Sequence, residues 1–199
     1  MSTSPSTVKY PDFVRRLFNI SGDPSKDFAH AVLGVATEVR ELLDASDQVN
    51  ALEERGDLRF YVVAAAQVIG DHLGTELPLQ DLSVTAFETA QDILADDEEI
   101  VEHDLSVRVN DLLDHAKRWV GYGKQPANLL SVMHDVMVVE YLAPRVSPMV
   151  AEFVPLPKVE AVNMAKLLKR YPGGEFSAFH ALQRDLEAER ATLETASVA

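Results

Sequence analysis

The chain carries, from residue 30 to residue 44, the stretch His30-Ala-Val-Leu-Gly-Val-Ala-Thr-Glu38-Val-Arg-Glu41-Leu-Leu-Asp44. Its apolar residues recur at positions i, i+3, i+7 and i+10, which are Val32, Val35, Val39 and Leu42. This spacing predicts a helix with one apolar face. Glu38 and Glu41 lie three residues apart and would therefore share a face of the same helix.

A second acidic pair, Glu54 and Asp57, lies in the stretch Asn50-Ala-Leu-Glu-Glu54-Arg-Gly56-Asp57-Leu-Arg-Phe-Tyr61. Two such helices packed side by side would gather four carboxylates in one place. Like charges disfavour ionisation, and a hard cation with oxygen ligands such as Mg²⁺ is the usual compensation. The alternative is a pair of solvated acidic helix faces. Gly56 would allow a partner helix to approach closely, or leave room for a metal or phosphate.

The composition excludes several classes of function. The formal net charge is −14, which argues against nonspecific nucleic-acid binding because that requires a basic surface. The chain has no cysteine, so disulfides, zinc–thiolate sites and cysteine nucleophiles are excluded. No apolar run reaches the length of a bilayer, and no signal-peptide pattern opens the chain. We therefore expect a cytoplasmic protein with no membrane partner.

Helical spacing recurs in the later segments, and no alternating apolar pattern of strand length stands out. The sequence therefore predicts an all-α protein, folded as a helical bundle. Helices near residues 158–170 and 176–191, separated by Tyr171-Pro-Gly-Gly174, are expected to close the domain. Residues 192–199 are expected to form a disordered tail.

The second half of the chain resembles the first. Glu41-Leu-Leu-Asp44 recurs as Asp111-Leu-Leu-Asp114, and Asn50-Ala-Leu with Gly-Asp57 recurs as Asn128-Leu-Leu with His-Asp135. We interpret residues 1–98 and 99–191 as two degenerate repeats that form one compact domain. Arg108 and Val132 stand at the positions of Glu38 and Glu54, so the second repeat cannot build a site of four carboxylates.

These motifs resemble those of a known family. Glu-x-x-Glu, a spacer and Glu-x-x-Asp, followed by Leu-x-Phe-Tyr, are similar to the metal-binding helices of the MazG-like, all-α nucleoside triphosphate pyrophosphohydrolases. The stretch Asn163-Met-Ala-Lys166-Leu-Leu-Lys-Arg170-Tyr171-Pro is similar to the late motif of that family. The loop Tyr122-Gly-Lys124 resembles its Tyr-x-Lys loop. The resemblance spans roughly residues 10–190.

The resemblance implies Mg²⁺-dependent hydrolysis of nucleoside or deoxynucleoside triphosphates to monophosphate and pyrophosphate. It implies that Mg²⁺, with Mn²⁺ as a substitute, binds to Glu38, Glu41, Glu54 and Asp57. One of these carboxylates, or the neighbouring Glu53, would accept the proton of the attacking water. The expected substrate-binding residues are Lys124, Lys166 and Arg170 for phosphates, with Asn163, Tyr171, Tyr122 and Trp119; core packing is the alternative role for Trp119.

Relatives with a single repeat form dimers in which helices of two subunits complete each nucleotide site. The chain therefore resembles such a dimer fused into one polypeptide, either a monomeric pseudo-dimer or a homodimer of pseudo-dimers. Two other interpretations stay open. One is a catalytically weak nucleotide-binding or regulatory protein on the same helical scaffold, and the other is a helical scaffold with acidic faces and no ligand.

Overall fold

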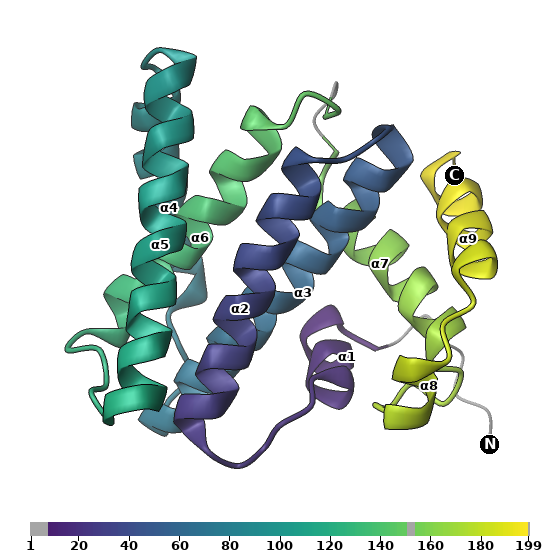
Figure 1. Ribbon diagram of the computed structural model, residues 1–199, viewed down its shortest axis with the longest axis horizontal. Coiled ribbons are helices and arrows are strands. Elements are labelled where there is room, and N and C mark those ends of the chain that lie inside the picture. Colours follow the sequence, from purple (N-terminus) through teal and green to yellow (C-terminus); the bar gives the residue numbers. More distant parts are fainter. Residues whose placement is uncertain (1–7, 151–153, 199) are drawn as a thin grey trace.

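The computed structural model describes residues 8–150 and 154–198, and within these ranges every regular element is a helix (Figure 1). In chain order the helices are α1 (Tyr10–Leu17), α2 (Pro24–Leu43), α3 (Gln48–Leu73), α4 (Leu79–Leu94), α5 (Glu98–Tyr122), α6 (Leu129–Val146), α7 (Leu156–Arg170), α8 (Ala178–Leu182) and α9 (Leu186–Val198). The predicted all-α fold is confirmed. Across the described ranges, no helix has both the length and the apolar character needed to cross a bilayer.

Helices α2 and α3 form an antiparallel hairpin whose ends are fixed by aspartates. The side chain of Asp23 caps α2 by accepting hydrogen bonds from the backbone N–H groups of Ser25 and Lys26. Asp47 caps α3 by accepting from the N–H of Asn50. Such caps satisfy N–H groups that have no partner inside the helix. Since residues 44–47 alone join the two helices, the end of α2 lies beside the start of α3.

The other helices pack around this hairpin. Helices α5 and α6 pack against α2, α4 packs against α6, and α7 packs against α3, while α9 contacts both α7 and α3. Figure 1 shows α4 and α5 at one edge of the molecule and α7, α8 and α9 at the other. Buried apolar side chains of both halves form one continuous core, which includes Val35, Leu58, Ile69, Met133 and Leu142.

A buried ion-pair group fixes α7 on the hairpin. The guanidinium of Arg59 on α3 lies 3.2 Å from Glu140 on α6 and 2.9 Å from Glu160 on α7. The Glu140 side chain is 9% exposed, so both its charge and that of Arg59 are largely removed from water and depend on each other. This group connects three helices and sets the face that α7 presents to α3.

The C-terminal region differs from the sequence prediction in two ways. The helix expected over residues 176–191 is divided into α8 and α9, because the side chain of Asp185 accepts a hydrogen bond from the N–H of Ala188 and starts a new helix. The disordered tail expected from residue 192 is instead helical through Val198, and Leu193 is buried there. Between Tyr171 and Glu189 no side chain is fully buried, so residues 172–188 form a surface segment of half-buried and exposed residues.

Candidate metal centre

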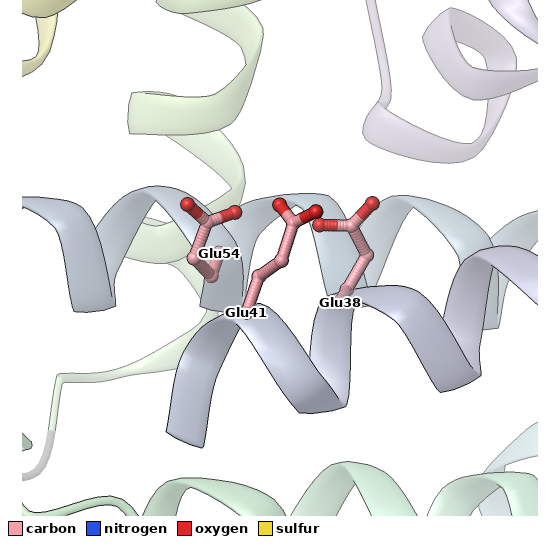
Figure 2. Close-up of side chains that lie close together, drawn as sticks. All are labelled: Glu38, Glu41 and Glu54. Carbon is pink, nitrogen blue, oxygen red and sulfur yellow. The ribbon is translucent and has the colours of Figure 1, made fainter. Parts of the chain in front are cut away.

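Three carboxylates meet where α2 and α3 lie side by side. Glu38 and Glu41 come from α2 and Glu54 from α3, and one oxygen of each lies within 4.8 Å of the others. Figure 2 shows the three carboxyl groups pointing to the same side of the helix pair. Within the described residues, this is the only cluster with such spacing. The hairpin explains it, because it places the last two turns of α2 against the first two turns of α3.

The cluster is electrostatically unfavourable without a cation. Burial, together with Asp57, Glu41 and Glu54, raises the pKa of Glu38 to about 9. Burial, together with Asp57 and Glu53, raises the pKa of Glu54 to about 7. One oxygen of Glu38, Oε2, is buried and has no hydrogen-bond partner. A buried acceptor without a partner costs about 1–3 kcal/mol.

Glu54 has one neutral partner. The side-chain amide of Asn50, one turn earlier on α3, donates a hydrogen bond of 2.5 Å to Oε1 of Glu54. This bond orients the carboxylate of Glu54 through one of its two oxygens. The donor set is therefore made of carboxylate oxygens alone, of which one is buried without a partner. Such a set fits a hard divalent cation such as Mg²⁺ or Mn²⁺ and does not fit a thiophilic metal.

Asp57, the fourth predicted ligand, is bound differently from the other three. Its two oxygens accept hydrogen bonds from Nδ2 of Asn163, at 2.7 Å, and from Nζ of Lys166. Lys166 also lies 3.3 Å from Glu53 and is fully buried. The structure thus brings Asn163 and Lys166 to the acidic residues, where they contact the carboxylates themselves.

Asn163 is held in place from its other side. Its Oδ1 accepts a hydrogen bond of 2.8 Å from the hydroxyl of Tyr10 on α1. Burial and the charge of Asp57 raise the pKa of Tyr10, so the hydroxyl keeps its proton and acts as the donor. The Cβ that an alanine would have at position 56 would lie 3.0 Å from Cβ of Asn163. Gly56 therefore allows the close approach of α7, the first of the two roles considered for it.

The acidic residues open onto a cavity of about 440 Å³. Carboxylates of α2 and α3 line one part of it, and two arginines, Arg170 and Arg184, also line it. Its remaining side chains are mostly aromatic: Phe18, His30, Phe60, Tyr61, Tyr171 and Phe176. The imidazole of His30 stacks on the ring of Phe18 at 4.5 Å. The cavity therefore offers anionic, cationic and aromatic surfaces to one ligand.

Two of the predicted substrate-binding residues, Arg170 and Tyr171, line this cavity. Arg170 is also bound to Glu189 of α9 by two hydrogen bonds of 2.9 and 2.6 Å. Since Tyr171 ends α7, its position depends on the same helix that carries Asn163 and Lys166. The late motif of the sequence and the acidic pairs therefore meet at one site.

The remaining predicted substrate-binding residues lie elsewhere. The indole of Trp119 packs against Phe28 and His72, with ring centroids 5.2 and 5.1 Å apart. Phe28 precedes Glu38 by ten residues on α2, which places it about 15 Å along the helix axis at 1.5 Å per residue. Tyr122 and Lys124, which follow Trp119, are exposed. None of these three residues lines the cavity.

Several cavity residues were not predicted as site residues from the sequence. Phe60 and Tyr61 follow Asp57 by three and four residues on α3, so helical spacing alone could have placed them on the same face. Arg184 and Glu189 carried no such signal. The approach of Arg184 to the cavity, and its contact with Glu189, depend on the reversal of the chain after Tyr171 and on the break between α8 and α9.

The hairpin of α5 and α6, in the second half of the chain, has a different arrangement. Arg108 on α5 donates hydrogen bonds of 2.7 Å to Asp104 and 2.5 Å to Asp135 on α6. Here a guanidinium neutralises the carboxylates, so no cation is needed between α5 and α6. Comparison of the chain with protein-family models, curated proteins and solved structures finds no match.

Proposed function

We propose that this protein is a Mg²⁺-dependent nucleoside triphosphate pyrophosphohydrolase of the MazG-like type. One observation carries the proposal: Glu38, Glu41 and Glu54 form an uncompensated carboxylate cluster that faces a cavity also lined by arginines and aromatic rings. An anionic substrate would be repelled by the carboxylates alone. A divalent cation bound to them would supply positive charge to the phosphates and activate water for attack.

The cavity residues have different roles under this proposal. These roles suit phosphoryl transfer, which depends chiefly on positioning and on charge neutralisation. Glu38, Glu41 and Glu54 would hold the cation. Arg170 would contact a phosphate, since its guanidinium is oriented by Glu189. The aromatic side chains offer faces on which a nucleobase can stack.

Glu53 and Asp57 would have a secondary role under this proposal. Both are bound to Lys166, whose single positive charge is shared between them and offsets only one of their two negative charges. Asp57 would join the metal ligands only if Lys166 turned away from it. We therefore assign the three glutamates as the metal ligands, with Asp57 as a fourth ligand that binds only after Lys166 has moved. One of the site carboxylates would accept the proton.

The fused-dimer organisation belongs to the same proposal. Hairpin α2–α3 supplies the metal ligands, while α7 supplies Asn163, Lys166 and Arg170. The site thus draws on both halves of the chain. In the second half, Arg108 takes the position that a cation would have between α5 and α6, which agrees with one competent site in the pair of repeats.

The experiment is to incubate the protein with each common ribo- and deoxynucleoside triphosphate and Mg²⁺, and to separate the products. We expect monophosphate and pyrophosphate in equal amounts, with no reaction in EDTA. Release of orthophosphate with nucleoside diphosphate would contradict cleavage between the α and β phosphates.

A second candidate function is favoured by the ion pair between Lys166 and Asp57. If this pair persists when substrate is bound, one metal ligand stays occupied, and the protein would bind nucleotides with weak or no turnover. Nucleotide-dependent thermal stabilisation without products would support this candidate. Absence of any response to nucleotide and Mg²⁺ would instead leave a helical scaffold without a ligand.

A further inference from the structure

Two arginines that line the cavity, Arg170 and Arg184, share one carboxylate partner behind it, Glu189. The carboxylate of Glu189 accepts hydrogen bonds from Nε and Nη2 of Arg170, at 2.9 and 2.6 Å, and from Nη2 of Arg184, at 3.1 Å. The Glu189 side chain is 3% exposed. One buried carboxylate therefore fixes two guanidiniums, and the group has a net positive charge.

The two guanidiniums keep donors free for a ligand. A guanidinium has five N–H donors, and Glu189 uses only part of them. Within the described residues, Nη1 of Arg170 and both Nε and Nη1 of Arg184 donate no hydrogen bond to the protein. Both side chains line the same cavity as the carboxylate cluster.

Support of the fold does not account for the position of Arg184. It lies two residues before the start of α9, where the helix dipole disfavours a positive charge. Its side chain is 41% exposed, and Arg170 already compensates Glu189 with two hydrogen bonds, so the buried carboxylate does not depend on Arg184 alone. Arg184 lies within the surface segment of residues 172–188, which has no fully buried side chain. We therefore attribute the position of Arg184 to a role in the cavity and not to a role in packing.

The other cation near the acidic residues is already engaged. Lys166 is fully buried and contacts Asp57 and Glu53. A ligand that brings negative charge into the cavity would thus find its free donors on Arg170 and Arg184. The planar fork of donors in arginine matches the oxygens of a phosphate group better than a single ammonium does.

We propose that Arg184, aligned with Arg170 by Glu189, binds the terminal phosphate of the substrate and selects triphosphates over mono- and diphosphates. This inference rests on the proposed function. The cation at Glu38, Glu41 and Glu54 would hold the phosphates nearest the cleaved bond, and the two arginines would hold the far end of the chain. The substrate would then be recognised by the length of its polyphosphate as well as by its base.

The test is calorimetric titration in Mg²⁺ with a non-hydrolysable α,β-methylene nucleoside triphosphate, the matching diphosphate and the monophosphate. Arg184→Gln should weaken triphosphate binding about 10-fold or more, the loss expected for a charged hydrogen bond. Monophosphate affinity should stay within about twofold. Arg184→Lys, which keeps the charge but not the fork, should recover part of the loss. Inorganic tripolyphosphate should show the same ranking of the variants.

The matched control is Arg190→Gln. Arg190 lies on α9 with 37% of its side chain exposed and pairs with Asp47 and Glu194, and it does not line the cavity. Equal losses for the triphosphate and the monophosphate in Arg184→Gln, or no loss, would overturn the assignment. If the unmodified protein binds none of the nucleotides, the proposed function fails as well. If it binds the triphosphate and Arg184→Gln binds equally well, the assignment of Arg184 alone fails.

Discussion

Lys166 of α7 donates a hydrogen bond from Nζ to Oδ2 of Asp57 of α3, with the lysine side chain fully buried. The sequence assigned Lys166 to a phosphate of the substrate. In the structure, its single positive charge is shared between Asp57 and Glu53 beside the metal cluster. The neighbouring carboxylates outweigh the effect of burial and raise the pKa of Lys166, so it stays charged. The pair connects the two halves of the chain at the site itself.

Lys166→Met tests this role. Removing the buried cation would leave Asp57 and Glu53 without compensation, so the free energy of unfolding should fall by about 3 kcal/mol. Because Mg²⁺ could then bind where the ammonium was, it should raise the Tm of the variant more than that of the unmodified protein. Thermal denaturation with and without Mg²⁺ measures both effects. Lys169→Met, at an exposed position of α7, is the control and should change little. A similar loss of stability in both variants would argue against a specific role for Lys166.

Glu38 should make stability depend on pH when no metal is bound. Its pKa in the folded protein, about 9, is above its ordinary value of 4.5. A carboxyl with a raised pKa opposes folding once the unfolded chain ionises, so its cost grows as pH rises from about 4.5 to about 9 and is constant above that. A shift from 4.5 to about 9 corresponds to at most about 5 kcal/mol at pH 8, at about 1.4 kcal/mol per pKa unit. Glu38→Gln should therefore stabilise the metal-free protein at pH 8, by roughly 2–5 kcal/mol, and should have little effect at pH 4. Denaturant titrations at both pH values in EDTA check this. A variant less stable at pH 8 would show that ionised Glu38 is favourable in the fold.

Gly56→Ala should disturb the contact between α3 and α7. The new Cβ would lie 3.0 Å from Cβ and 3.1 Å from Nδ2 of Asn163, whose amide donates to Asp57. Alanine favours a helix over glycine by about 1 kcal/mol, but this contact should reverse the sign and cost about 1–2 kcal/mol net. Gly121→Ala, within α5 and with open space at its Cβ, is the control. It should be neutral or slightly stabilising in the same denaturant titration. Stabilisation by both substitutions would indicate that α7 can move away without cost.

Interactions between residues that are close in the sequence could be predicted at this site, and interactions between distant residues could not. The spacing between the glutamates and the apolar residues shows which face of each helix carries Glu38, Glu41 and Glu54. Because the two helices are adjacent in the sequence and form one short hairpin, the carboxylate cluster could be predicted. The hydrogen-bond partners of Asp57 could not be predicted from the sequence, because Asn163 and Lys166 lie more than a hundred residues away along the chain. The sequence predicted that both residues bind the substrate, but it did not predict that they contact the carboxylate of Asp57.

The C-terminal region shows a different limit. The helical spacing of residues 176–191 gave no sign of the break at Asp185, since the side chain that caps α9 also fits a helix interior. Trp119 was expected either to stack on a base or to pack in the core. Its contacts with Phe28 and His72 place it in the core at the far end of α2. Which part of α2 a residue of another helix contacts is known only once the packing of the helices is known.

The two hairpins should differ in their need for metal. Glu54→Gln removes a charge from the carboxylate cluster, and we expect pyrophosphate formation to fall at least about 100-fold, the effect of losing a catalytic electrostatic contact. Asp135→Asn removes a partner of Arg108 in the second hairpin, where no cluster of metal ligands forms, and should be milder. Initial rates of pyrophosphate release and Mn²⁺ titration of each variant measure the difference. Equal losses would indicate that the second hairpin also holds a metal.

The last prediction concerns the division of the site between the two halves. The metal ligands lie on α2 and α3, whereas Asn163, Lys166 and Arg170 lie on α7, and residues 95–97 are a short link between α4 and α5. Fragments 1–96 and 97–199 should each be inactive. Each would also expose an apolar face that the other covers, because α2 packs on α5 and α6, and α4 on α6. Separate fragments should therefore self-associate or precipitate.

Expressed together, the fragments should assemble and recover pyrophosphate release, because the link contributes no side chain to the cavity. The experiment is co-purification of differently tagged fragments, followed by the product assay in Mg²⁺. Glu54→Gln in the first fragment and Lys166→Met in the second would then show whether each half contributes to activity. Full activity of the first fragment alone would refute the shared site, since α7 would then contribute nothing to the reaction.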